Sequence, residues 1–163
     1  MAVKKGSVPA YKLLYLQQVF LLTTIDKRGV PHVIPQLWTI PVSFKPELVA
    51  IAVANTRLTH KLLCQTKEFV LNMPPASLAR SVWACAPPHG NGDKFKRAGL
   101  TPVKAARVKP PRIKECIAAI ECKVVKSIPA GDHTIFVGNV VATHRNKGGR
   151  VLLNAPGSHE FSV

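Results

Sequence analysis

The chain has 163 residues, of which 47% are hydrophobic and 19% charged, a composition typical of a globular domain and not of a disordered chain. With 23 Lys and Arg against 8 Asp and Glu, its formal net charge of +15 favours polyanions or phosphorylated small molecules as ligands. No apolar run reaches the ~20 residues that span a bilayer, and the first residues contain no signal-peptide core. We therefore expect a cytoplasmic protein that does not enter a membrane.

The basic residues do not form the pattern of a nucleic-acid-binding surface. They are scattered without a run of five, and the two Trp, two Tyr and six Phe do not alternate with them as base-stacking platforms would. The four cysteines include no C-x-x-C pair and the six histidines show no metal-ligand spacing, so we predict no metal site and four reduced thiols, mostly buried. The even spacing of Cys116 and Cys122 predicts a shared strand face.

Taken in chain order, the apolar pattern predicts about seven strands, mostly joined as hairpins, with two or three short helices between them. Residues 11–17 fit a helical turn or an edge segment. The order predicts one domain over residues 1–163, with a core at about 10–145 and a tail at 146–163, folded as a small antiparallel barrel. The expected strands are 19–25, 30–37, a proline-kinked edge segment at 36–44, 47–54, 69–73, 117–128 and 133–144, and the expected helices are 58–65, one capped by Ser77, and 93–99.

The first candidate site lies between strand 47–54 and helix 58–65. The start of a helix offers unpaired N–H groups and a partial positive charge, and phosphate binds there readily. Thr56 and Thr59 add hydroxyl groups, and Arg57 adds charge-assisted hydrogen bonds. An ordinary helix cap at Asn55 or Thr56, with Arg57 in solvent, explains the same pattern. The residues of this candidate phosphate site are Asn55, Thr56, Arg57, Leu58 and Thr59.

The second candidate site is the proline-kinked segment, which offers a surface for a flat heterocycle. An isoalloxazine ring needs apolar walls and hydrogen bonds to its polar edge. Trp38, Ile40, Pro41 and Val42 are suited to the walls. The side chains of Gln36, Thr39 and Ser43 are suited to the edge, and a proline-kinked edge strand with a buried Trp is the alternative. The full segment is Gln36, Leu37, Trp38, Thr39, Ile40, Pro41, Val42 and Ser43.

Two single residues complete the candidate sites. His133, in the turn Gly131-Asp132-His133, suits a proton donor or a residue that positions a substrate, or else a ring that hydrogen-bonds the turn backbone. Lys94 suits a contact to a reduced flavin or a nucleotide phosphate, or else an exposed lysine at a helix start. Without a G-x-G-x-x-G motif the chain has no Rossmann nucleotide site, so redox chemistry would depend on a flavin.

The order of these motifs resembles the flavin reductase-like family, which includes flavoredoxins, short-chain flavin reductases and archaeal ferric reductases. The resemblance covers roughly residues 10–145. The C-terminus, which ends HEFSV, departs from the aromatic-glycine motif of many members, and the basic charge is not a family trait. The motifs are Thr23–Asp26 with Gly29, Pro41–Phe44 with Pro46, Asn55–Arg57 with Thr59, Glu68–Val70 with Asn72, Asp93–Phe95 with Ala98–Leu100, and Gly131–Thr134 with Phe136–Gly138.

The resemblance implies a mostly β, Greek-key, FMN-binding split barrel with a few short helices, in a homodimer with FMN near the subunit interface. It implies that residues 36–43 hold the isoalloxazine, that residues 55–59 hold the phosphate, and that Lys94 approaches the site. The Gly131–His133 triplet is implied to lie near the flavin and to be linked to nicotinamide binding.

We therefore expect an NAD(P)H-dependent reductase that passes hydride through FMN to free flavin, a ferric complex or a protein acceptor. His133 would position the donor or relay a proton. A non-enzymatic FMN electron carrier is the first alternative, and a basic nucleic-acid-binding barrel is the second. The two are separated from a reductase by NAD(P)H oxidation and by salt-dependent retention on oligonucleotides, respectively.

Overall fold

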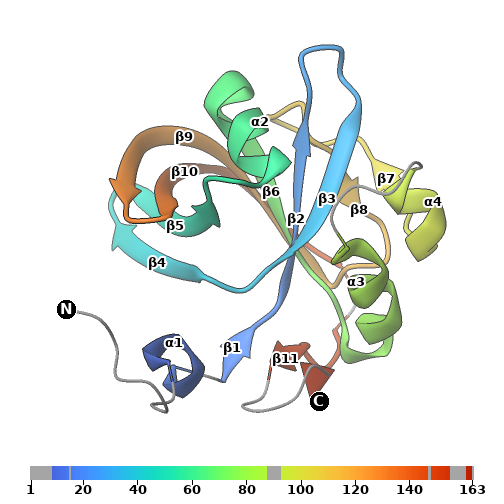
Figure 1. Ribbon diagram of the computed structural model, residues 1–163. Coiled ribbons are helices and arrows are strands. Elements are labelled where there is room, and N and C mark those ends of the chain that lie inside the picture. The colour runs from blue at the N-terminus through green and yellow to red at the C-terminus, as the bar shows by residue number, and fades with distance from the viewer. Residues whose placement is uncertain (1–8, 15, 88–92, 147, 155–160, 163) are drawn as a thin grey trace.

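The computed structural model describes residues 9–14, 16–87, 93–146, 148–154 and 161–162 (Figure 1). Strands dominate and the helices are short, so the predicted mostly β fold class is confirmed. No helix in these ranges is long and apolar enough to cross a membrane. The elements are α1 (Ala10–Leu13), β1 (Gln17–Gln18), β2 (Phe20–Ile25), β3 (Pro31–Gln36), β4 (Thr39–Phe44), β5 (Glu47–Ala54), α2 (Leu58–Thr66), β6 (Glu68–Met73), the 3₁₀ helix η1 (Ala76–Leu78), α3 (Ala79–Cys85), α4 (Lys94–Ala98), β7 (Pro102–Val103), β8 (Arg112–Ile113), β9 (Ala118–Ala130), β10 (His133–Arg145), β11 (Leu153–Asn154) and β12 (Phe161–Ser162).

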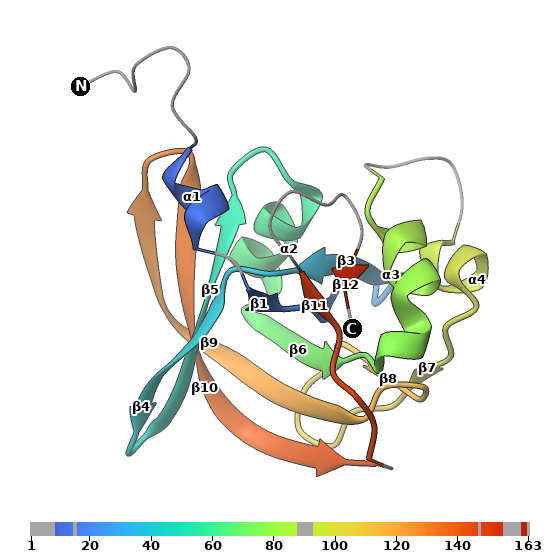
Figure 2. The ribbon, with the colours of Figure 1, turned by 90° about the horizontal axis from the view of Figure 1, so that it is seen from below.

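The main sheet has seven antiparallel strands in the order β3-β2-β6-β9-β10-β5-β4. Both β9 and β10 have 13 residues, and register shifts near Gly138 and Val140 bend them. Figures 1 and 2 show the result, in which these two strands curve and carry β5 and β4 around one side of the barrel. The proline-kinked segment forms β4 at the edge of the sheet, as predicted, because proline has no N–H to donate and is tolerated where no further strand needs a donor.

Two apolar cores lie on opposite faces of β2, which explains why this strand is buried along its whole length. Leu21 faces the core beneath α3 and α4, together with Val82 and Phe95. Leu22 faces the barrel interior, together with Phe69. Because successive side chains of a strand point to opposite faces, β2 contributes side chains to both cores.

Gly138 has a packing role inside the barrel. A Cβ atom at this position would lie 2.6 Å from Cζ of Phe69, which is fully buried. Because Gly138 has no side chain, the ring of Phe69 can fill the barrel interior next to β10.

Several expected local features differ from the structure. Ser77 does not cap a helix, because Pro75 starts the 3₁₀ turn and Ser77 lies inside it. Cys116 and Cys122 do not share a strand face, because Cys116 precedes β9 and packs in the core under α3 while Cys122 lies in the barrel core. The helix expected at 93–99 is confirmed as α4, and the Asp93 carboxylate caps it by accepting the N–H groups of Phe95 and Lys96.

Candidate functional site

The N-terminal end of α2 presents its backbone donors without a side-chain cap. Arg57 is the N-cap residue in an extended conformation, and its side chain forms no capping hydrogen bond. The N-cap is therefore Arg57 and not Asn55 or Thr56, although Arg57 is exposed, as the alternative expected. An uncapped helix start attracts anions through its free N–H groups and its dipole.

Thr59 strengthens this picture because its hydroxyl is buried without a partner. The residue is 1% exposed, and its Oγ1 forms no hydrogen bond to any described residue. Leaving a buried hydroxyl unpaired costs about 1–3 kcal/mol, so such an atom in the first turn of a helix fits a ligand oxygen. This observation agrees with a phosphate group at the start of α2.

Lys94 lies close to the same region but is not the exposed lysine of the alternative interpretation. It is 7% exposed, and its Nζ donates a hydrogen bond of 2.8 Å to the carbonyl oxygen of Cys85, at the C-terminus of α3. Burial lowers the pKa of Lys94, and the charges of Arg97 and Arg57 lower it further. The Arg57 guanidinium is thus a further source of positive charge on the side of the molecule that holds Lys94.

His133, at the start of β10, is held by one aromatic contact and one hydrogen bond. Its ring stacks on Trp38, with centroids 4.6 Å apart and planes at 29°, and its Nδ1 lies 2.7 Å from the Asp132 carboxylate. This hydrogen bond lowers the pKa of Asp132. The alternative interpretation proposed a hydrogen bond from the ring to the turn backbone. The ring instead binds the side chain of Asp132.

A polar network joins His133 to the loop before α2. The Asn55 N–H donates to the Asp132 carbonyl at 2.9 Å, and the Thr134 hydroxyl donates to Asn55 Oδ1 at 2.9 Å. Because that hydroxyl has one proton, it must accept from His60 Nε2, which lies 2.9 Å away. The sequence assigned no site role to Thr134 or His60, because their contact depends on the pairing of β10 with β5.

An apolar pocket of about 320 Å³ has Trp38 in its wall. Two polar atoms in its wall, Gln17 Oε1 and Thr39 Oγ1, are buried without a partner among the described residues. A mostly apolar hollow with a few unpaired polar atoms is the usual form of a site for a small ring compound. Its walls are Tyr11, Leu14, Gln17, Trp38, Thr39, Ile40, Ala50, Ile51, Ala52 and Ile135.

Three of the predicted ring-binding residues, Trp38, Thr39 and Ile40, line this pocket, whereas Gln36 has a different role. Gln36 is 5% exposed, and its Nε2 donates to the carbonyl oxygens of Trp38 and Ala52, so it fixes the corner between β3 and β4. Trp38 is 37% exposed and is not the buried Trp of the alternative interpretation. Leu37, Pro41, Val42 and Ser43 lie outside the pocket wall, and Tyr11, Gln17 and Ile135 are members that the sequence did not indicate.

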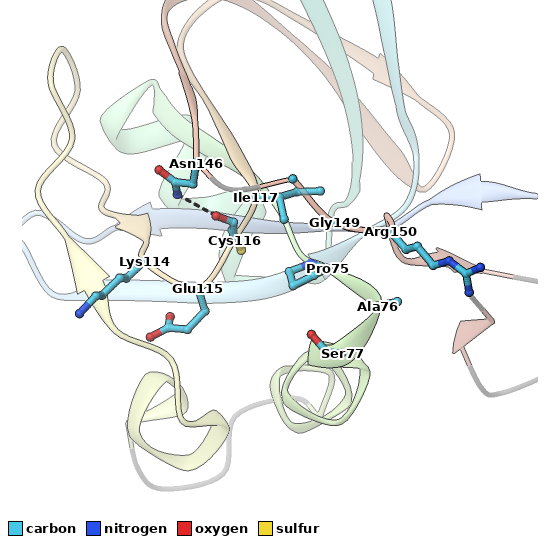
Figure 3. Close-up of a pocket in the computed structure, with 11 residues that line it drawn as sticks. Pro75, Ala76, Ser77, Lys114, Glu115, Cys116, Ile117, Asn146, Gly149 and Arg150 are labelled. Atoms are coloured by element: carbon cyan, nitrogen blue, oxygen red, sulfur yellow. Dashed lines mark hydrogen bonds between the residues drawn. The ribbon is translucent and has the colours of Figure 1, made fainter.

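A larger hollow of about 680 Å³ lies away from every predicted site residue (Figure 3). Its walls include Ser77, Lys114, Glu115 and Arg150, and the side chains of Lys114 and Arg150 point away from it in opposite directions. Glu115 accepts the N–H of Thr101. Since its charged groups point elsewhere or bind the protein, the smaller pocket beside Trp38 is the better candidate site.

Comparison with known proteins identifies the family and the fold of the chain. A family model described as "Flavin reductase like domain" matches residues 13–160. An uncharacterized protein of Archaeoglobus fulgidus is 38% identical over 134 residues, which are 80% of this chain and 74% of that protein. The structure of NADH:FAD oxidoreductase SgcE6 of Streptomyces globisporus has a TM-score of 0.86 at 22% identity, over 99% of this chain and 95% of that one. Flavoredoxin of Desulfovibrio vulgaris has a TM-score of 0.84 at 24% identity, over 99% and 92%. The predicted split-barrel fold is confirmed.

Proposed function

The chain belongs to the flavin reductase-like family, and on this premise we propose that it is an FMN-dependent oxidoreductase. NADH or NADPH would be the hydride donor, and free flavin, a ferric complex or a protein would be the acceptor. The observation that carries the proposal is the link between two half-sites. Trp38 forms a wall of the apolar pocket and stacks on His133, and His133 adjoins the Asn55 loop that leads into α2.

The start of α2 would hold the FMN phosphate. Arg57 would contribute charge-assisted hydrogen bonds, Thr59 its unpaired hydroxyl, and the helix its free N–H groups. Asn55, Thr56 and Leu58 would shape the backbone around this anion. Lys94 has donors beyond the one bound to Cys85, so it would add positive charge at short range.

The apolar pocket and the strand beside it would hold the ring system. Bound FMN would supply the ability to accept a hydride and to pass on electrons one or two at a time. Trp38 and Ile40 would exclude water from the ring, and Thr39 would offer its unpaired hydroxyl to a polar edge. Pro41, Val42 and Ser43 would extend this surface along β4, Leu37 would support its start, and Gln36 would fix its backbone.

His133 would act on the donor and not on the flavin phosphate. Its Nδ1 is bound to Asp132, so Nε2 is the nitrogen that remains for a substrate. The stack on Trp38 sets the plane of the imidazole. His133 would therefore position the nicotinamide nucleotide or hold a proton at Nε2.

A second copy of the chain would complete the protein as a homodimer. The outer side of β4 presents Ile40, Val42 and Phe44, which are 59%, 45% and 96% exposed, and β9 adds exposed Val125. Edge strands that expose large apolar side chains are usually covered by another chain. This surface borders the apolar pocket through Ile40, so a flavin bound there would lie near the proposed interface.

Steady-state oxidation of NADH and NADPH, with and without added FMN, tests the proposed reaction. A reductase consumes one of the two donors at a rate that depends on the bound or added flavin. A carrier like flavoredoxin binds FMN but oxidises neither donor. A protein that binds no flavin contradicts both.

A further inference from the structure

A basic segment runs from the end of β7 through β8 to Lys114. Residues 104–114 read KAARVKPPRIK and contain five Lys or Arg and no acid. The segment, called here the basic loop, runs beside β2, where the Thr23 hydroxyl donates to the Pro111 carbonyl (Figure 1). Its exposed cations are Lys104, Arg107, Lys109 and Lys114, and its buried anchors are Ala105, Val108, Pro110 and Ile113.

Buried polar groups of the sheet fix the backbone of the basic loop. The Glu121 carboxylate, which is 0% exposed, accepts the N–H groups of Ala106 and Arg107 at 2.8 and 2.6 Å. Glu68 accepts the N–H of Lys109 at 2.9 Å. The loop thus has a defined shape although it contains little regular secondary structure.

The same contacts leave Lys104, Arg107 and Lys109 without acidic partners among the residues that the structure describes. Glu121 and Glu68 bind backbone N–H groups of the loop, so their charge is directed inward. Within the described ranges, the ion pairs of Lys and Arg are Arg28 with Asp26 and Arg112 with Glu121, and neither involves the four exposed cations. Arg112 also points back to the Lys104 carbonyl and so closes the loop.

From this arrangement we propose that the basic loop is a docking surface for an acidic face of a protein partner. A fixed backbone that presents unpaired cations binds a complementary acidic surface without the cost of ordering that backbone and speeds encounter through electrostatic attraction. The loop carries no aromatic side chain on which a nucleic-acid base could stack, which favours a protein over a single-stranded nucleic acid. The proposal concerns a surface separate from the flavin site and does not depend on the reaction.

The test uses the full-length protein and two matched triple variants. K104Q/R107Q/K109Q removes three charges from the basic loop and keeps the backbone contacts. The probes are poly-L-glutamate, which stands in for an acidic protein face, and a duplex DNA, both at about 150 mM salt, where distant charges are screened.

The control variant, K61Q/R80Q/K126Q, removes the same number of exposed charges from α2, α3 and β9. The loop variant is expected to bind poly-L-glutamate about tenfold more weakly than the control does, because three neighbouring ion pairs are lost together. Equal loss in both variants would mean that net charge alone is responsible and would overturn the proposal. Loss of DNA binding in the loop variant, with poly-L-glutamate binding unchanged, would assign the surface to nucleic acid and overturn it as well. Unfolding curves that coincide with wild type confirm that either result reflects charge.

Discussion

The indole of Trp38 stacks on the imidazole of His133 at a centroid distance of 4.6 Å, although Trp38 lies between β3 and β4 and His133 begins β10. One ring forms a wall of the apolar pocket, and the other adjoins the loop before α2. If the stack sets the plane of His133, then Trp38→Leu is expected to slow flavin reduction by about tenfold or more, since small misplacements of a positioned group reduce rates strongly. Stopped-flow absorbance measures this rate, and Trp38→Phe is the control because it keeps an aromatic face. An unaltered rate in the Leu variant would show that the stack has no part in the reaction.

Arg57 is the residue whose loss should weaken cofactor binding most directly. Arg57→Ala is expected to raise the dissociation constant for FMN by the equivalent of about 1.5–3 kcal/mol, which is the range for a charged hydrogen bond. Arg57→Lys should lose less, because it keeps the charge but not the two-pronged geometry of the guanidinium. Titration followed by flavin fluorescence measures both. Unchanged affinity for FMN in the Ala variant would contradict the proposal that the start of α2 binds the FMN phosphate.

Thr59 offers a test in which stability and binding change in opposite directions. Thr59→Val replaces a buried, unpaired hydroxyl with a methyl group of similar size. The flavin-free protein should be as stable as wild type or up to about 1 kcal/mol more stable, while FMN should bind about 1 kcal/mol more weakly. Chemical unfolding and FMN titration give the two numbers. A variant that loses stability and keeps its affinity would mean that the hydroxyl serves the fold.

Glu121 should make the stability of the protein dependent on acid pH. Burial raises its pKa, but hydrogen bonds from the Ala106 and Arg107 backbone and from His144 outweigh burial, so the pKa lies below its usual value. A lowered folded-state pKa means that the carboxylate stabilises the protein above the unfolded-state pKa and that this contribution is lost as pH falls through the lowered value.

Glu121→Gln is therefore expected to lower the free energy of unfolding at pH 7 by about 1–3 kcal/mol and to flatten its fall below the ordinary glutamate pKa of 4.5. Urea unfolding at pH 7 and at acid pH measures both effects. Glu115→Gln is the control, because that carboxylate accepts one backbone N–H at an exposed site. Wild-type stability in the Glu121 variant at neutral pH would contradict the expected role.

Phe44 tests the proposed dimer, because its side chain is 96% exposed at the edge of the sheet. Phe44→Asp places a charge on that apolar surface and should shift the protein from dimer toward monomer in sedimentation experiments. Since Phe44 packs against little in its own chain, the unfolding of the monomer should not change. A wild-type protein that sediments as a monomer would exclude the dimer altogether.

The sequence predicted the elements better than it predicted the contacts. Hairpins and the proline-kinked edge strand follow from local pattern, and so does the cap of α4 at Asp93. The environment of Lys94 does not, because it depends on how α4 packs against the end of α3. The pocket likewise combines Tyr11 from a weak N-terminal segment with Ile135 from a distant strand, and no local signal connects these two residues.

The most direct measurement of the central proposal is the visible absorption spectrum of the purified protein, reconstituted with FMN and then mixed anaerobically with NADH or NADPH. We expect flavin bands that bleach within seconds with one of the two nucleotides. Bands that persist with both would contradict the reductase and leave an electron carrier. A protein that does not retain FMN would contradict the assignment of Trp38, Arg57 and Thr59 to a flavin site.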